Sequence, residues 1–221
     1  MRLLSIPAIV IGVAIAILFF KVYGLVTRPS VPAPVAFIVS QFAPDVEIGA
    51  RVSDAKHGVA SMTYVPHLGF VGVPNSHGQN TPTGRAVNFS QVRLLLDERT
   101  RSEPNPNPAK ARVDAVEVVT GDAAATDDIE AAIMSVLRRV PTEGCIKSPD
   151  EDRLRQVHVW ITPNERGGIA IINDFFVGTP SATHGPYMTN VIAFVGKFDG
   201  GRTLRGNYTN ETCTQISKPT T

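Results

Sequence analysis

The chain has few cysteines, no closely spaced cysteine pair and no long basic run, and each absence excludes a class of function. Cys145 and Cys213 are its two cysteines, so a zinc knuckle, a c-type haem site and a Cys-x-x-Cys redox motif are excluded. Lys and Arg total 21 against 20 Asp and Glu, a net charge of +1, and no basic stripe stands out. We therefore exclude nucleic acid as a partner.

The sequence also lacks the common catalytic signatures. It has no glycine-rich phosphate loop, no His-Glu-x-x-His and no Gly-x-Ser-x-Gly elbow, so we predict no cofactor and no metal. Aromatic residues make up 7% of the chain, whereas there are 17 prolines and 18 glycines. This composition favours short strands joined by many turns over a helical bundle.

One long apolar run is present, from Leu3 to Val26. At about 1.5 Å per residue, this run can cross a hydrocarbon core of about 30 Å as a tilted helix. Phe19, Phe20 and Tyr23 resemble an aromatic belt, and no small-x-small cleavage site follows the core. We therefore expect residues 1–26 to be a retained transmembrane anchor in contact with the lipid bilayer.

Small residues recur every four positions along this run. Ala8, Gly12 and Ala16 lie on one face of the expected helix, where the backbone of another helix can approach closely. The stripe favours a partner helix in the membrane. The alternative is that Ala and Gly are simply frequent in any anchor.

The orientation of the anchor depends on the cysteines, because Arg2 on one side and Lys21 and Arg28 on the other nearly balance. A Cys145–Cys213 disulfide needs an oxidising compartment and is worth roughly 4 kcal/mol in the chain-entropy model. We expect a cytoplasmic N-terminus and a periplasmic or extracellular domain. Two free, buried thiols in a cytosolic domain are the alternative.

The soluble part is expected to be an α+β domain, mainly an antiparallel β-sheet with one packed amphipathic helix. Residues 27–35 contain three prolines and predict an extended spacer. A β-rich part, 36–101, and an α+β part, 110–216, follow, with a soft boundary in the proline-containing stretch 100–110 and a flexible tail at 217–221.

The expected elements follow from hydrophobic spacing. Strands are predicted at 36–42, 59–65, 70–73, 86–96 and 112–120. A helix is predicted at 127–139, capped by Asp127 and stopped by Pro141 and Gly144. Two hairpins are predicted, one pairing 156–162 with 169–176 and the other pairing 190–198 with 202–208.

The most site-like cluster surrounds the loop 177–186. It contains a potential nucleophile, base and carboxylate, together with two further polar residues: Ser181, His184, Asp174, Asn173 and Tyr187. A membrane-anchored hydrolase that uses Asp174, Ser181 and His184 is the resulting hypothesis. The alternative is a solvated loop in which Asp174 caps a turn.

Other polar residues have plainer interpretations. His57, His67 and His77 lack the close pair typical of metal ligands, so we interpret them as turn residues rather than as a metal site. His158 and Trp160 share the less apolar face of a strand, so Trp160 is a possible interface anchor, unless another layer covers that face. The acidic stretch 150–152 is expected to be a solvated loop.

These observations favour a non-catalytic accessory or assembly subunit of a larger membrane or envelope complex. Its expected partners are membrane protein subunits, contacted through the anchor and possibly through the soluble domain. The hydrolase is the first alternative. A pilus-like or surface-fibre subunit is the second, although the chain lacks the processing site and the early acidic residue that pilins use.

Overall fold

The protein is described by a computed structural model that covers most of the chain after Pro29. The described residues are 30–66, 69–75, 79–80, 86–96, 100, 102–141, 143–150, 153–162, 166–176 and 186–196. The expected anchor, 1–26, lies outside them. Among the described residues, no helix is long and apolar enough to cross a bilayer.

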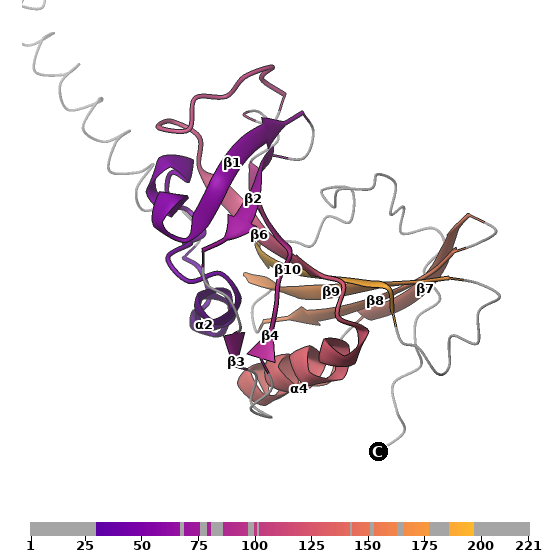
Figure 1. The fold of residues 1–221 in the computed structure, drawn as a ribbon. Coiled ribbons are helices and arrows are strands. Elements are labelled where there is room, and N and C mark those ends of the chain that lie inside the picture. The colour runs from indigo at the N-terminus through magenta and orange to yellow at the C-terminus, as the bar shows by residue number, and fades with distance from the viewer. Residues whose placement is uncertain are drawn as a thin grey trace, which may run out of the picture. The chain divides into compact units, whose positions relative to one another are not determined.

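The described part is dominated by an antiparallel β-sheet with helices on one side (Figure 1), which confirms the expected mostly antiparallel α+β architecture. Eight strands follow the order β1-β2-β5-β6-β10-β9-β8-β7. They are β1 (Val59–Val65), β2 (Gly69–Pro74), β5 (Gln91–Leu96), β6 (Val113–Thr120), β7 (Glu143–Asp150), β8 (Arg153–Ile161), β9 (Gly167–Phe176) and β10 (Met188–Val195). A small ribbon pairs β3 (Gln79–Asn80) with β4 (Ala86–Val87).

The two expected parts of the soluble domain share this sheet. β5 pairs with β6 across the stretch where a soft boundary was expected, and β10 pairs with both β6 and β9. The stretch at 100–110 lies in the connection between the neighbouring strands β5 and β6. The predictions for β1, β8 and β9 are confirmed.

Helix α2 (Ala33–Phe42) replaces both the strand expected at 36–42 and the end of the extended spacer. The buried residues Val35, Ile38, Val39 and Phe42 recur at helical spacing. Pro34 lies in the first turn, where a missing backbone N–H is tolerated. An uninterrupted apolar run fits a strand and a buried helix equally well, and packing against the sheet selects the helix.

Helix α4 (Thr126–Leu137) is the predicted amphipathic helix, but its start and end differ from the prediction. The 3-10 helix η2 (Ala123–Ala125) precedes it, and Asp122 Oδ1 accepts a hydrogen bond from Ala124 N there. Asp127 therefore lies inside the first turn and does not cap the helix. Arg138 ends α4 in the left-handed conformation with φ +51°, whereas Gly144 belongs to β7.

Both helices pack on the same face of the sheet (Figure 1). This helix face contributes Val116, Val118, Ile171 and Val191 to a shared core with Ile129 and Ile133 of α4. The expectation of one packed helix is therefore wrong, because α2 is a second. The opposite face, here called the second face, carries a separate apolar cluster drawn from β5, β6, β8, β9 and β10.

Candidate functional site

The neighbouring candidates Asn173 and Asp174 lie on opposite faces of the sheet, because successive residues of a strand alternate. On the helix face, Asn173 Oδ1 accepts a hydrogen bond from Thr189 Oγ1 at 2.9 Å. The Thr189 hydroxyl also lies 2.8 Å from Thr126 Oγ1 on α4. Asp174 contacts Arg155 on the second face. The pleat of β9 thus separates two members of the expected cluster.

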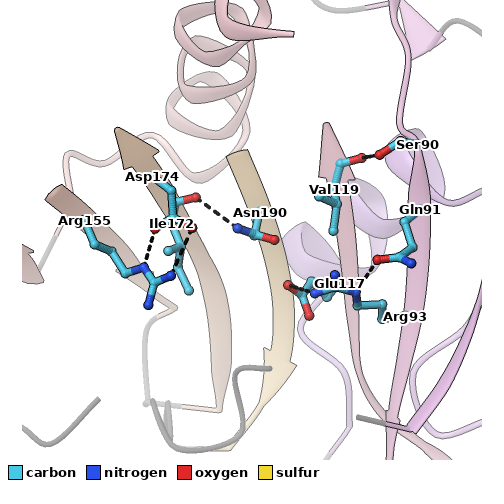
Figure 2. Close-up of polar contacts among 9 residues, drawn as sticks. All are labelled: Ser90, Gln91, Arg93, Glu117, Val119, Arg155, Ile172, Asp174 and Asn190. Atoms are coloured by element: carbon cyan, nitrogen blue, oxygen red, sulfur yellow. Dashed lines mark hydrogen bonds and ion pairs between the residues drawn. The ribbon is translucent and has the colours of Figure 1, made fainter. Parts of the chain in front are cut away.

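Asp174 forms a bidentate ion pair with Arg155, its direct neighbour in the β8–β9 register (Figure 2). Arg155 Nε donates to Asp174 Oδ1, and Nη2 donates to Oδ2 at 3.0 Å. The two side chains are only 6% and 1% exposed. Asp174 therefore accepts hydrogen bonds from one arginine through both of its carboxylate oxygens. It also differs from a triad carboxylate, whose role is to orient a histidine.

A second arginine–carboxylate pair joins β5 to β6 on the same face (Figure 2). Arg93 Nη1 donates to Glu117 Oε1 at 3.1 Å, and Arg93 Nε donates to Gln91 Oε1 at 2.6 Å. The Glu117 side chain is 2% exposed, and that of Arg93 is 13% exposed. This pair is thus slightly more open to water than the Arg155–Asp174 pair.

The strand β10 lies between the two ion pairs and carries Asn190 on the second face (Figure 2). Asn190 Nδ2 is 3.5 Å from Ile172 O, the outer limit of a hydrogen bond. The apolar cluster of this face consists of Leu95, Ala115, Val157, Val159, Ala170, Ile172, Ile192 and Phe194. The second face therefore has an apolar centre with a paired charge on each side.

This arrangement is suited to packing rather than to proton transfer. Each carboxylate is neutralised by a guanidinium held in the strand register, and a buried charge is tolerated when it is paired in this way. A general base needs a carboxylate or imidazole aimed at a substrate proton. Asp174 instead directs both of its oxygens at Arg155, and Glu117 directs Oε1 at Arg93.

His158 and Trp160 lie on the helix face, and α4 lies over this part of the sheet. His158 Nδ1 is 3.0 Å from Glu130 Oε1, and its Nε2 is 2.9 Å from Gln156 Nε2. Trp160 is 0% exposed and belongs to the core shared with the helices. The hypothesis that Trp160 is a surface anchor is therefore wrong, and the alternative that another layer covers this face is correct.

The outer face of α2 is unusual because the helix contains no charged residue. Phe37 is 52% exposed on this face, and Ala33, Ala36, Ser40 and Gln41 are also exposed. A solvent-facing helix normally carries polar and charged residues on its outer side. This outer face of α2 is therefore better suited to being covered than to facing water.

Two adjoining hollows lie at the base of α2 and share Asp45 and Glu47. The first, of about 360 Å³, is lined in addition by residues of α2 and of the segment that follows it. The second, of about 530 Å³, extends to Asp54 and His57. Among the described residues, no group of His, Cys, Asp and Glu is arranged to hold a metal ion.

Several expected site residues lie outside the described residues. They are Ser181, His184, His67, His77, Cys213, Ala8, Gly12 and Ala16. The second strand of the expected 190–208 hairpin lies there as well. Tyr187 is described: its ring stacks on Phe176 with centroids 4.2 Å apart, and its backbone N–H donates to Asp174 O at 2.9 Å. Cys145 lies in β7, opposite Val157 of β8.

The second-face residues Arg155, Arg93, Glu117 and Asn190 were not predicted as a group. The available signal was a charged or amide side chain within an otherwise apolar strand, such as Glu117 among the valines of β6. Pairing them requires the strand order, since Glu117 and Arg93 are 24 positions apart. Sequence alone does not supply that order.

No protein-family model matches the chain, and neither a curated protein nor a solved structure is significantly similar to it.

Proposed function

We propose that the protein is a non-catalytic accessory or assembly subunit of a larger membrane or cell-envelope complex. In this proposal residues 1–26 anchor the chain with a cytoplasmic N-terminus, and the domain is periplasmic or extracellular. Its partners are membrane protein subunits, reached through the small-residue stripe of the anchor and through the outer face of α2.

The observation that carries the proposal is the uncharged outer face of α2. Phe37 exposes about half of its surface there, and large aromatic side chains are among the residues that contribute most to protein interfaces. The hollow beside α2 is adjacent to this face, since Ala36 and Ser40 help to line it. A partner that covers Phe37 can fill this hollow as well.

The paired state of the candidate catalytic carboxylate supports the same reading. A hydrolase that uses Asp174 with Ser181 and His184 requires this carboxylate to serve the histidine. Arg155 instead binds both of its oxygens.

The proposal is tested by purifying the full chain from its native membrane in mild detergent and quantifying the proteins that accompany it. We expect Phe37→Ser to lower the recovery of the main partner about tenfold or more, because truncating an interface hot spot costs about 2 kcal/mol or more. Gly12→Leu combined with Ala16→Leu tests the anchor stripe in the same assay and should also release the partner.

Val140→Ser is the matched control, since Val140 is 58% exposed and lies beyond the end of α4. It should leave partner recovery unchanged. If Phe37→Ser and the anchor double variant both retain every partner at the native level, the proposed function is wrong.

A further inference from the structure

The second face of the sheet is built to be covered. Its cluster residues are at most 5% exposed, and the three central strands β6, β10 and β9 are apolar on both sides. An antiparallel strand with one face in water alternates apolar and polar residues, whereas a strand covered on both faces does not. The central strands therefore require a layer on each side.

The described helices supply only one of these layers. The core beneath α2 and α4 uses Val116, Val118, Val191 and Ala193, all of which belong to the helix face. Every member of the second-face cluster, by contrast, belongs to a strand. Within the described ranges, no helix contributes to that cluster. Because the cluster residues are at most 5% exposed in this chain on its own, their cover belongs to the chain itself.

The chain leaves the sheet at the end of a central strand. β10 ends at Val195 in the centre of the sheet, between β6 and β9. Gly196 follows with φ +82°, a conformation that suits glycine and turns the chain. The sequence then continues through residues 197–221, which include the apolar residues Phe198, Leu204, Tyr208 and Ile216.

The strand register gives this continuation an attachment point. Cys145 of β7 is directly opposite Val157 of β8, and Val157 belongs to the second-face cluster. Residues directly opposite in an antiparallel pair share a face, so position 145 is on the second face. The other cysteine of the chain, Cys213, lies in the segment that follows β10.

We propose that residues 197–221 fold back over the second face and are held there by a disulfide between Cys145 and Cys213. In the closing step the two S–H bonds break and one S–S bond forms. The two protons and two electrons pass to the disulfide of a thiol oxidant, which is reduced to a dithiol. The occupant of this face is thus the protein's own C-terminal segment.

The experiment places a photo-crosslinking diazirine amino acid of leucine size at position 192 in the full chain. Ile192 is on the second face, whereas its neighbour Val191 is on the helix face and is the matched control position. After illumination in detergent, crosslinked peptides are identified by mass spectrometry. Position 192 should capture peptides from 201–221 of the same chain, and position 191 should capture α2, which packs over it.

Disulfide formation is tested in parallel. An unreduced digest should contain a linked Cys145–Cys213 peptide that disappears on reduction, and Cys213→Ser should lower the yield of the position-192 crosslink at least threefold. Should replacement at position 192 prevent folding, Ile172 provides a second position on the same face. Capture of a second copy, of another protein, of a different segment of this chain, or of nothing while position 191 captures α2 would overturn the proposal.

Discussion

Replacing Arg155 with methionine tests whether the second face is a dry interior. The change keeps much of the side-chain volume but removes both hydrogen bonds from the guanidinium to Asp174. The Asp174 side chain is 1% exposed, so water cannot readily replace them. Breaking a buried pair by removing one partner costs about 3–5 kcal/mol, a large share of the roughly 5–15 kcal/mol that stabilises a typical protein. We expect Arg155→Met to lower the free energy of unfolding by about 3–5 kcal/mol.

Urea unfolding of the full chain in detergent measures this loss. Trp160 is the only tryptophan of the chain and is fully buried, so its fluorescence reports on the sheet. The double variant Arg155→Met/Asp174→Leu removes both charges and should return to within about 1 kcal/mol of the native stability, because apolar replacements of a buried pair are often neutral. Arg166→Met, at an exposed position, should change the stability by no more than about 0.5 kcal/mol.

Either of two results would contradict a dry second face that is stabilised by the ion pair. A loss below about 1 kcal/mol for Arg155→Met means that solvent reaches Asp174 and that the second face is wet. A double variant as unstable as Arg155→Met means that the loss comes from packing rather than from an unpaired charge.

Two further substitutions test the packing of the helix side and the centre of the sheet. Gly168→Ala places a methyl group against Trp160 O and 2.8 Å from Phe194 Cζ, so it should lower the free energy of unfolding by about 1–3 kcal/mol. The control is Gly121→Ala, whose added carbon has its nearest neighbour at 3.7 Å, and it should lower the free energy of unfolding by less than about 0.5 kcal/mol. Urea unfolding measures both losses. Trp160→Ala should lower the free energy of unfolding by about 3–5 kcal/mol. Its control, Val140→Ala, should lower it by about 0.5 kcal/mol or less. Far-ultraviolet circular dichroism follows that pair, and equal losses would show that Trp160 is not a core residue.

The parts of the fold that could be predicted are those in which one local pattern dominates. β1 was predicted at its observed bounds, and α4 was found because Ile129, Ala132 and Ile133 recur at helical spacing. α2 was missed because its exposed positions include Ala36 and Phe37, and these interrupt the stripe formed by Val35, Ile38, Val39 and Phe42. β7, Glu143–Asp150, was missed because its sequence contains Gly and Pro; pairing with β8 identifies it as a strand.

The candidate site was harder to predict because its contacts join distant strands. Asn173 and Asp174 are adjacent in sequence and were grouped together, yet the pleat separates them. Arg155 and Asp174 are 19 positions apart and meet only through the β8–β9 register. Hydrophobic periodicity gives the face on which a residue lies. It does not give the residue that lies opposite.

The outer face of α2 and the second face of the sheet should respond differently to mutation, which allows the two proposals to be separated. The outer face of α2 is exposed at Phe37, so a change there removes contacts with a partner without opening the core. The second face holds buried ion pairs and apolar residues within the sheet itself, so a change there lowers the stability of the domain whether or not a partner is bound. Loss of the partner at unchanged stability therefore identifies the α2 surface, whereas loss of stability first identifies the second face.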